Sequence, residues 1–95
     1  MAWRTSERAA FDLQLIAEQG IVNFGARHAR DYVSSLLDMF ETLSTTPRMA
    51  GERKAAHSVV RLMPFGAHNI LYVIEDEDIV ILRVLHGLQN WFELL

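Results

Sequence analysis

VVRLMPFGAHNILYVIEDEDIVILRVLHG, residues 59–87, is the stretch that decides the fold. It contains three runs of branched and aromatic apolar residues, separated by Gly66-Ala67 and Asp76-Glu77. The runs are 58–65, 68–75 and 78–86. Runs of this length, bounded by turn residues, predict strands. Because such short connections leave no room for a crossover, neighbouring strands are predicted to be antiparallel.

The predicted sheet is apolar on both faces, whereas a sheet with one wet face alternates apolar and polar residues. Because side chains alternate along a strand, one face of the run 68–75 carries Ile70, Tyr72 and Ile74, and one face of the run 78–86 carries Ile79, Ile81 and Leu85. The opposite face carries Leu71 and Val73 in the first of these runs, and Val80, Leu82 and Val84 in the second. Either the rest of the chain or self-association covers both faces, or one face receives an apolar helix or strand of a partner. We favour the partner, because contiguous exposed apolar surface usually marks an interface.

Two helices are predicted upstream of this block. Residues 7–24 repeat apolar side chains at helical spacing, with Ser6 suited to cap the start of the helix and Gly25 suited to end it. Residues 26–44 carry the strongest stripe. Its members are Ala29, Val33, Leu36, Leu37, Phe40 and Leu43. The short break between the two helices predicts an antiparallel helical hairpin.

The remaining segments are short. Residues 2–5 are predicted to form a short edge strand, and 44–57 an exposed loop after the helix that Pro47 ends. Residues 88–95 are predicted to form a short terminal helix, too short to cover the second sheet face fully. The sequence thus predicts an α+β fold of order β-α-α-β-β-β. In it a small antiparallel sheet packs against an N-terminal helical hairpin, with a short C-terminal helical turn.

Size and composition limit the possible functions. With 95 residues we expect a single domain, 1–95. The absence of cysteine excludes disulfides and thiolate metal sites. A net charge of −3 argues against nucleic acid as a direct partner, because phosphate contacts need a basic surface. With no apolar run long enough to span a bilayer, we expect a cytoplasmic protein with no membrane role.

No motif for a metal or cofactor is present, and we expect neither. The four histidines share no ligand spacing, and the sequence holds no phosphate-binding glycine loop. One interpretation gathers Arg61, Arg83 and His86 with basic loop residues into an RNA-cleaving patch, with His86 as acid or base. We favour a simpler one, in which Arg61 and Arg83 are paired with acids or with a partner.

Five pieces of the chain, in this order and spacing, resemble the ParE family of toxins from type II toxin–antitoxin modules, within the RelE/ParE superfamily. They are Ala9-x-x-Asp12-Leu13-x-x-Ile16, Ala29-x-x-Tyr32, Pro47-x-x-x-Gly51, Arg61-x-x-Pro64-Phe65-Gly66-x-His68-x-Ile70-x-Tyr72 and Ile81-x-Arg83-Val84-Leu85-His86-Gly87. The resemblance covers nearly the whole chain, and the predicted element order agrees with the superfamily fold.

The resemblance implies a toxin that inhibits DNA gyrase by binding it. It also implies a ParD-like ribbon-helix-helix antitoxin whose tail wraps the toxin in a hetero-oligomer, and operator DNA reached only through that antitoxin. On this basis we expect the antitoxin- or target-binding residues on the strand block and the C-terminal segment. They are Arg61, Phe65, His68, Tyr72, Arg83, His86, Trp91 and Phe92.

Two alternatives remain open. RelE-type relatives cleave mRNA on the ribosome, and Arg61, Arg83 and His86 match such a basic cluster in part. The acidic net charge and the lack of a tyrosine after Tyr72 depart from that pattern, as does Leu88-Gln89 where some ParE members are basic. The second alternative is a protein-interaction module without toxicity.

Overall fold

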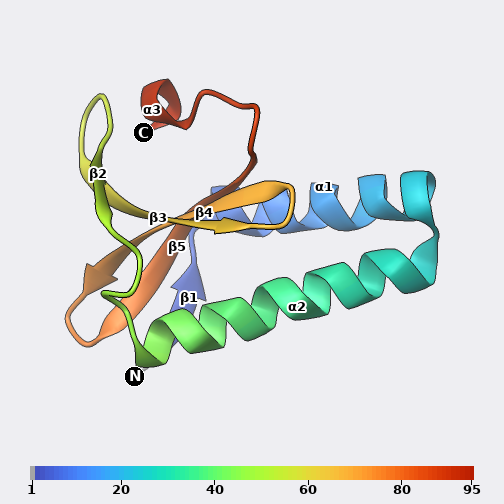
Figure 1. Cartoon of the computed structure of the whole chain (residues 1–95), viewed down its shortest axis with the longest axis horizontal. Coiled ribbons are helices and arrows are strands. Elements are labelled where there is room, and N and C mark those ends of the chain that lie inside the picture. The colour runs from blue at the N-terminus through green and yellow to red at the C-terminus, as the bar shows by residue number, and fades with distance from the viewer. Residues whose placement is uncertain (1) are drawn as a thin grey trace.

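A computed structural model describes residues 2–95 and shows a helical hairpin, a five-stranded sheet and a short terminal helix (Figure 1). The predicted element order is confirmed, with one additional strand. The elements are β1 (Trp3–Thr5), α1 (Glu7–Phe24), α2 (Ala26–Thr45), β2 (Glu52–Lys54), β3 (Val59–Phe65), β4 (His68–Glu75), β5 (Asp78–His86) and α3 (Trp91–Leu94).

The strands lie in the order β1-β5-β4-β3-β2. Of the three predicted strands, β3 is antiparallel to β4 and β4 is antiparallel to β5, as expected. The predicted edge strand β1 pairs with β5 in parallel, with Trp3 opposite Ile79 and Thr5 opposite Ile81. The long excursion between β1 and β5 allows this parallel pairing, and the sheet is therefore mixed but largely antiparallel.

The prediction of an unbroken loop over 44–57 is wrong at β2, which pairs antiparallel with β3. Glu52 lies opposite Arg61 and Lys54 opposite Val59. All three residues of β2 are exposed. A short, charged edge strand buries no side chain, so it leaves no apolar alternation for a sequence pattern to detect.

The helical hairpin begins and turns as the sequence predicts. Ser6 Oγ accepts a hydrogen bond from Ala9 N at 3.0 Å and caps α1. Gly25, with φ of 90°, joins the two helices. Figure 1 shows the helices side by side, reaching past the sheet to the tip that joins them. Among residues 2–95, no helix has the length and apolar character needed to cross a membrane.

The main core lies between the helical hairpin and one sheet face. Its fully buried members come from both helices and from β4 and β5, so the predicted stripe of α2 is confirmed as a packing face. They include Leu36, Phe40 and Leu43 of α2 and Ile70, Tyr72, Ile79 and Ile81 of the sheet.

A β-bulge changes the faces predicted for the end of β5. Leu71 pairs with Arg83 and Tyr72 with Ile81, so Leu82 is the extra residue. The extra residue inverts the alternation beyond it. Val84 therefore packs in the main core and Leu85 on the opposite face, which is the reverse of the prediction.

The second sheet face carries a smaller core of Val60, Leu71 and Leu85, each at most 1% exposed. Trp91 and Leu95 of the C-terminal segment pack against it. Backbone hydrogen bonds from Ala56 N to Phe92 O (3.0 Å) and from His57 N to Leu95 O (3.3 Å) fasten this segment. The segment thus buries the centre of this face but leaves Leu62, Val73 and Leu82 half-buried, as expected of a segment too short to cover the face fully.

Candidate functional site: a groove between α1 and the end of β5

The end of β5 has no strand beside it on its outer edge. β1 pairs only with residues Ile79 to Ile81 of β5, and beyond these residues the start of α1 lies beside the strand. Ser6 N donates to Ile81 O (2.9 Å) and Ser6 Oγ donates to Leu82 O (2.7 Å). Ser6 thus satisfies this part of the sheet edge through its backbone N–H and its hydroxyl, in place of another strand, and a groove lies between α1 and this edge.

Asp12 of α1 holds this edge together. Its carboxylate accepts hydrogen bonds from Arg83 Nε (2.8 Å) and Arg83 Nη2 (3.0 Å), and from Val84 N at 2.9 Å. Both side chains are mostly buried, with 14% of Arg83 and 8% of Asp12 exposed. The hydrogen bond to Asp12 raises the pKa of the Arg83 guanidinium above its usual value, and burial opposes this rise. The simpler interpretation of Arg83, an arginine paired with an acid, is confirmed.

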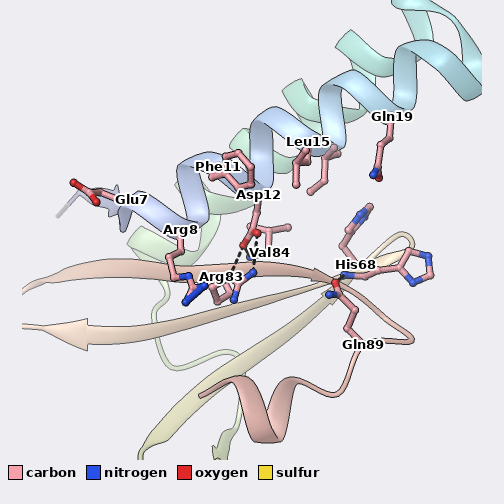
Figure 2. A pocket seen from close by; sticks show the side chains of 12 residues that line it. Glu7, Arg8, Phe11, Asp12, Leu15, Gln19, His68, Arg83, Val84 and Gln89 are labelled. Carbon is pink, nitrogen blue, oxygen red and sulfur yellow. Dashed lines mark hydrogen bonds and ion pairs between the residues drawn. The ribbon is translucent and has the colours of Figure 1, made fainter.

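Beside this pair lies a hollow of about 610 Å³ (Figure 2). One wall is α1, which turns Phe11, Leu15 and Gln19 toward the sheet edge. The opposite wall and floor hold His68, Arg83, Val84, His86 and Gln89. The surface therefore mixes the apolar side chains of Phe11 and Leu15 with polar and charged groups from both walls.

A second hollow, of about 370 Å³, continues from the first toward the tip of the hairpin. The two share Ile16, Gln19, His68 and His86. The second is lined mainly by apolar surface and by Phe24, His28, Ala29 and Tyr32, among others. We call the two hollows together the α1 groove.

The α1 groove is bordered by exposed apolar side chains of the helix. Phe11 is 57% exposed, Leu15 36% and Phe24 68%. These residues lie off the stripe of α1 that packs against the core, so the helix is apolar on two sides. Isolated exposed apolar residues are ordinary, but a row of them along a hollow is typical of an interface.

His68 lies at the junction of the two hollows and is part of a hydrogen-bonded cluster. Tyr32 Oη lies 2.6 Å from His68 Nδ1, donates to Phe65 O at 3.3 Å and accepts from Ala67 N at 3.2 Å. The ring of His86 meets that of His68 edge to face, with 5.7 Å between centroids. Burial lowers the pKa of His68 below its usual value; a positive charge on His86 lowers it further and Asp12 opposes both.

The structure brings only some of the predicted site residues together. His68, Arg83 and His86 line the α1 groove. Arg61 lies elsewhere: its Nη1 donates to Ala50 O at 2.7 Å, and its neighbours Arg48 and Glu52 line a separate hollow with it.

Tyr72 is completely buried, and its hydroxyl donates to Pro47 O at 2.7 Å. Its side chain therefore belongs to the core rather than to a surface. Phe65 is half-buried and packs on Tyr32 with ring centroids 5.8 Å apart. Trp91 packs on the second sheet face, while Phe92 beside it is 47% exposed.

The structure does not assemble the RNA-cleaving cluster. Arg61 lines a different hollow from Arg83 and His86, and the guanidinium of Arg83 is held by Asp12. His86 Nδ1 accepts a hydrogen bond from Leu88 N at 3.2 Å. Within residues 2–95 no group of His, Asp and Glu side chains is arranged to hold a metal.

Sequence reasoning assigned no role to Asp12, Phe11, Leu15 or Tyr32. Asp12 and Tyr32 stood in the motifs that carry the family resemblance, and this was the only signal for them. Phe11 and Leu15 are spaced four residues apart but lie outside the inner stripe, so a second apolar row on α1 was the signal that could have revealed the groove.

Comparison with known proteins agrees with this geometry. A family model described as ParE toxin of type II toxin-antitoxin system, parDE, matches residues 4–91. Toxin ParE3 of Caulobacter vibrioides is 29% identical over 79 residues, covering 83% of this chain and 79% of that protein. A solved chain from the chromosomal ParDE TA system of P. aeruginosa superposes with a TM-score of 0.76 at 20% identity, covering 90% of this chain and 95% of that one.

The fold and the family match together define a small toxin of the type II class. The chain belongs to the ParE toxin family of parDE toxin–antitoxin systems.

Proposed function

We propose that this toxin inhibits DNA gyrase by binding it, and that a ParD-like ribbon-helix-helix antitoxin neutralises it through the α1 groove. The proposal that the antitoxin binds in the α1 groove is supported by one observation. The groove is open, and it lies between exposed apolar side chains of α1 and a sheet edge without a neighbouring strand. The gyrase half is supported by membership of the ParE family.

The shape and chemistry of the groove suit a segment of protein. An amphipathic segment can lay apolar side chains on Phe11 and Leu15 and turn polar groups toward Gln19 and Gln89. We therefore propose the α1 groove as the antitoxin site, in place of the second sheet face that we expected from the sequence. The C-terminal segment already buries the centre of that face.

A binding mode of action is favoured over RNA cleavage. Arg83 is engaged with Asp12 and Arg61 with Ala50 O, so neither guanidinium is free to stabilise a developing charge without breaking a buried contact. We further propose that residues 1–95 act as one cytoplasmic domain without a cofactor, form a hetero-oligomer with the antitoxin, and reach operator DNA only through it.

The groove assignment is tested with Phe11→Glu and with Val22→Glu as a matched control. Both residues lie on α1 and are exposed, 57% and 83%, but only Phe11 lines the groove. Calorimetric binding of the antitoxin encoded by the neighbouring reading frame should weaken at least about tenfold for Phe11→Glu, about 1.4 kcal/mol. It should be unchanged for Val22→Glu.

Thermal unfolding of both variants should match that of the unaltered toxin, because exposed substitutions rarely change stability. Equal antitoxin affinity of the two folded variants would show that the antitoxin binds elsewhere.

A further inference from the structure

The histidine cluster at the junction of the two hollows holds local hydrogen bonds of the fold and also faces the groove. His68 lines both hollows and so does His86. Any segment that follows the α1 groove from Phe11 to Phe24 must pass over these two imidazoles. Their charge therefore bears directly on what the groove can bind.

We propose that His68, with His86 beside it, forms a proton-sensitive junction in the α1 groove, which binds an apolar segment of the antitoxin while the His68 imidazole is neutral and releases it as that imidazole is protonated. The inference rests on the groove being the antitoxin site. The inference adds a means of regulation to that site.

Burial of His68 and the neighbouring His86 favour the neutral form of its imidazole. Tyr32 Oη donates to Nδ1 across 2.6 Å when the imidazole carries its proton on Nε2. When Nδ1 is protonated it donates instead, and the hydroxyl proton of Tyr32 turns to Phe65 O, 3.3 Å away. Hydrogen bonds are thus available in both states. Charge and desolvation, rather than a lost contact, decide between them.

His86 behaves differently. Its Nδ1 accepts from Leu88 N at 3.2 Å, so a proton bound there would set two donors against each other. The same turn is closed by His86 N donating to Gln89 Oε1 and Gln89 N donating to His86 O, each at 2.9 Å. These contacts fix the turn that carries Gln89 into the groove.

The charged groups around His68 come from every element packed against it. From α1 come Asp12, already paired with Arg83 of β5, and the exposed Glu7 and Arg8 at the far end of the first hollow. From α2 come Tyr32 and His28, and from β5 comes His86. β3 presents Phe65 opposite His68.

Asp12 is the acid that faces the cluster most closely, and Arg83 largely compensates it. An imidazolium at His68 would therefore have little counter-charge close by, and a positive charge on His86 would oppose it further. An apolar occupant would remove the water that otherwise stabilises the imidazolium. Occupancy of the groove and protonation of His68 are consequently opposed, and binding should expel protons at acidic pH.

Nile red, an uncharged apolar dye, tests this without antitoxin or gyrase. We compare the unaltered toxin, the double variant His68→Asn/His86→Asn and the control His57→Asn, whose histidine is exposed in the β2–β3 connection. Asparagine is chosen because its Oδ1 can replace Nδ1 as the acceptor. Circular dichroism at each pH verifies that the proteins are folded.

Dye affinity of the unaltered toxin and of His57→Asn should fall about tenfold, about 1.4 kcal/mol, from pH 7.5 to pH 5, because an apolar occupant desolvates the imidazolium form of His68. The double variant should stay constant within about twofold. Equal affinity at both pH values, or the same fall in the double variant, would overturn the proposal.

Histidine NMR of the unaltered toxin gives an independent measurement if the double variant does not fold. Nile red should shift the ring signals of His68 and His86 and lower the pKa of His68. Dye that binds without moving either signal overturns the proposal. Because no antitoxin or gyrase is present, this failure is distinct from a failure of the proposed function.

Discussion

At the residue scale, the Asp12–Arg83 pair shows how a functional-looking arginine can be structural. Arg83 stands in the strongest family motif, yet its guanidinium is turned inward to a carboxylate that also accepts Val84 N. A charge reversal at Arg83 would bring two carboxylates together in a buried place. Lost toxicity in such a variant would then report unfolding rather than a lost contact with a target.

Asp12→Ala should lower the free energy of unfolding by about 3–5 kcal/mol, because it leaves the charge of Arg83 uncompensated in a mostly buried place. Asp12→Asn should lose less, since its Oδ1 can still accept from Val84 N. Urea unfolding measures both, and Asp31→Ala on the exposed side of α2 is the control. A loss no larger than that of Asp31→Ala would show that the pair is dispensable.

His68 should make the stability of the toxin depend on pH. Its pKa in the folded protein is lowered by burial, whereas the unfolded chain has the usual value of about 6.5. The unfolded chain therefore takes up the proton first. Stability is complete above about pH 6.5 and falls as the pH drops toward the lower folded pKa.

The measurement is the urea midpoint between pH 7.5 and pH 5 for the unaltered toxin, His68→Asn and His57→Asn. His68→Asn should show a smaller decline, and His57→Asn the full one. An identical decline in all three would assign the pH dependence to other groups.

At the element scale, local patterns predicted the parts that bury a regular face. The stripe of α2 and the strands β3, β4 and β5 were predicted because each carries apolar residues at its own period. β2 was missed because it buries nothing, and the faces of Val84 and Leu85 were inverted because a bulge adds one residue without a sequence signature.

The turn between β3 and β4 is fixed by Gly66 and Tyr32. Gly66 has φ of 53°, and a β-carbon there would lie 2.7 Å from Tyr32 Oη. Gly66→Ala should therefore destabilise the toxin more than Gly25→Ala, which meets only backbone strain of about 1–3 kcal/mol. At Gly25 a β-carbon would have no neighbour within 4 Å.

Thermal unfolding of the two variants, with near-ultraviolet circular dichroism of the aromatic residues, compares them directly. If Gly66→Ala is no less stable than Gly25→Ala, close packing of Tyr32 on the turn does not hold the groove floor in place.

At the scale of the whole molecule, two different segments cover the two apolar faces of the sheet. The helical hairpin buries one face, and the C-terminal segment buries the centre of the other (Figure 1). The sequence predicted that one face of the sheet would be left for a partner, whereas the exposed apolar row lies on α1. Only tertiary packing decides which of the two apolar rows of this helix faces inward.

The candidate site was predictable only in part for the same reason. His68, Arg83 and His86 were named from the sequence and line the α1 groove. Arg61, named with them, lies on β3 with its guanidinium directed to Ala50 O. Residues on different strands come together by register and bulge position, which residue spacing along the chain does not specify.

The most direct test of the account is a DNA gyrase supercoiling assay with the purified, folded toxin. We predict that supercoiling is inhibited in proportion to toxin, and that the antitoxin restores it for the unaltered toxin but poorly for a Phe11→Glu variant that still inhibits gyrase. Full gyrase activity at saturating folded toxin would contradict the central claim.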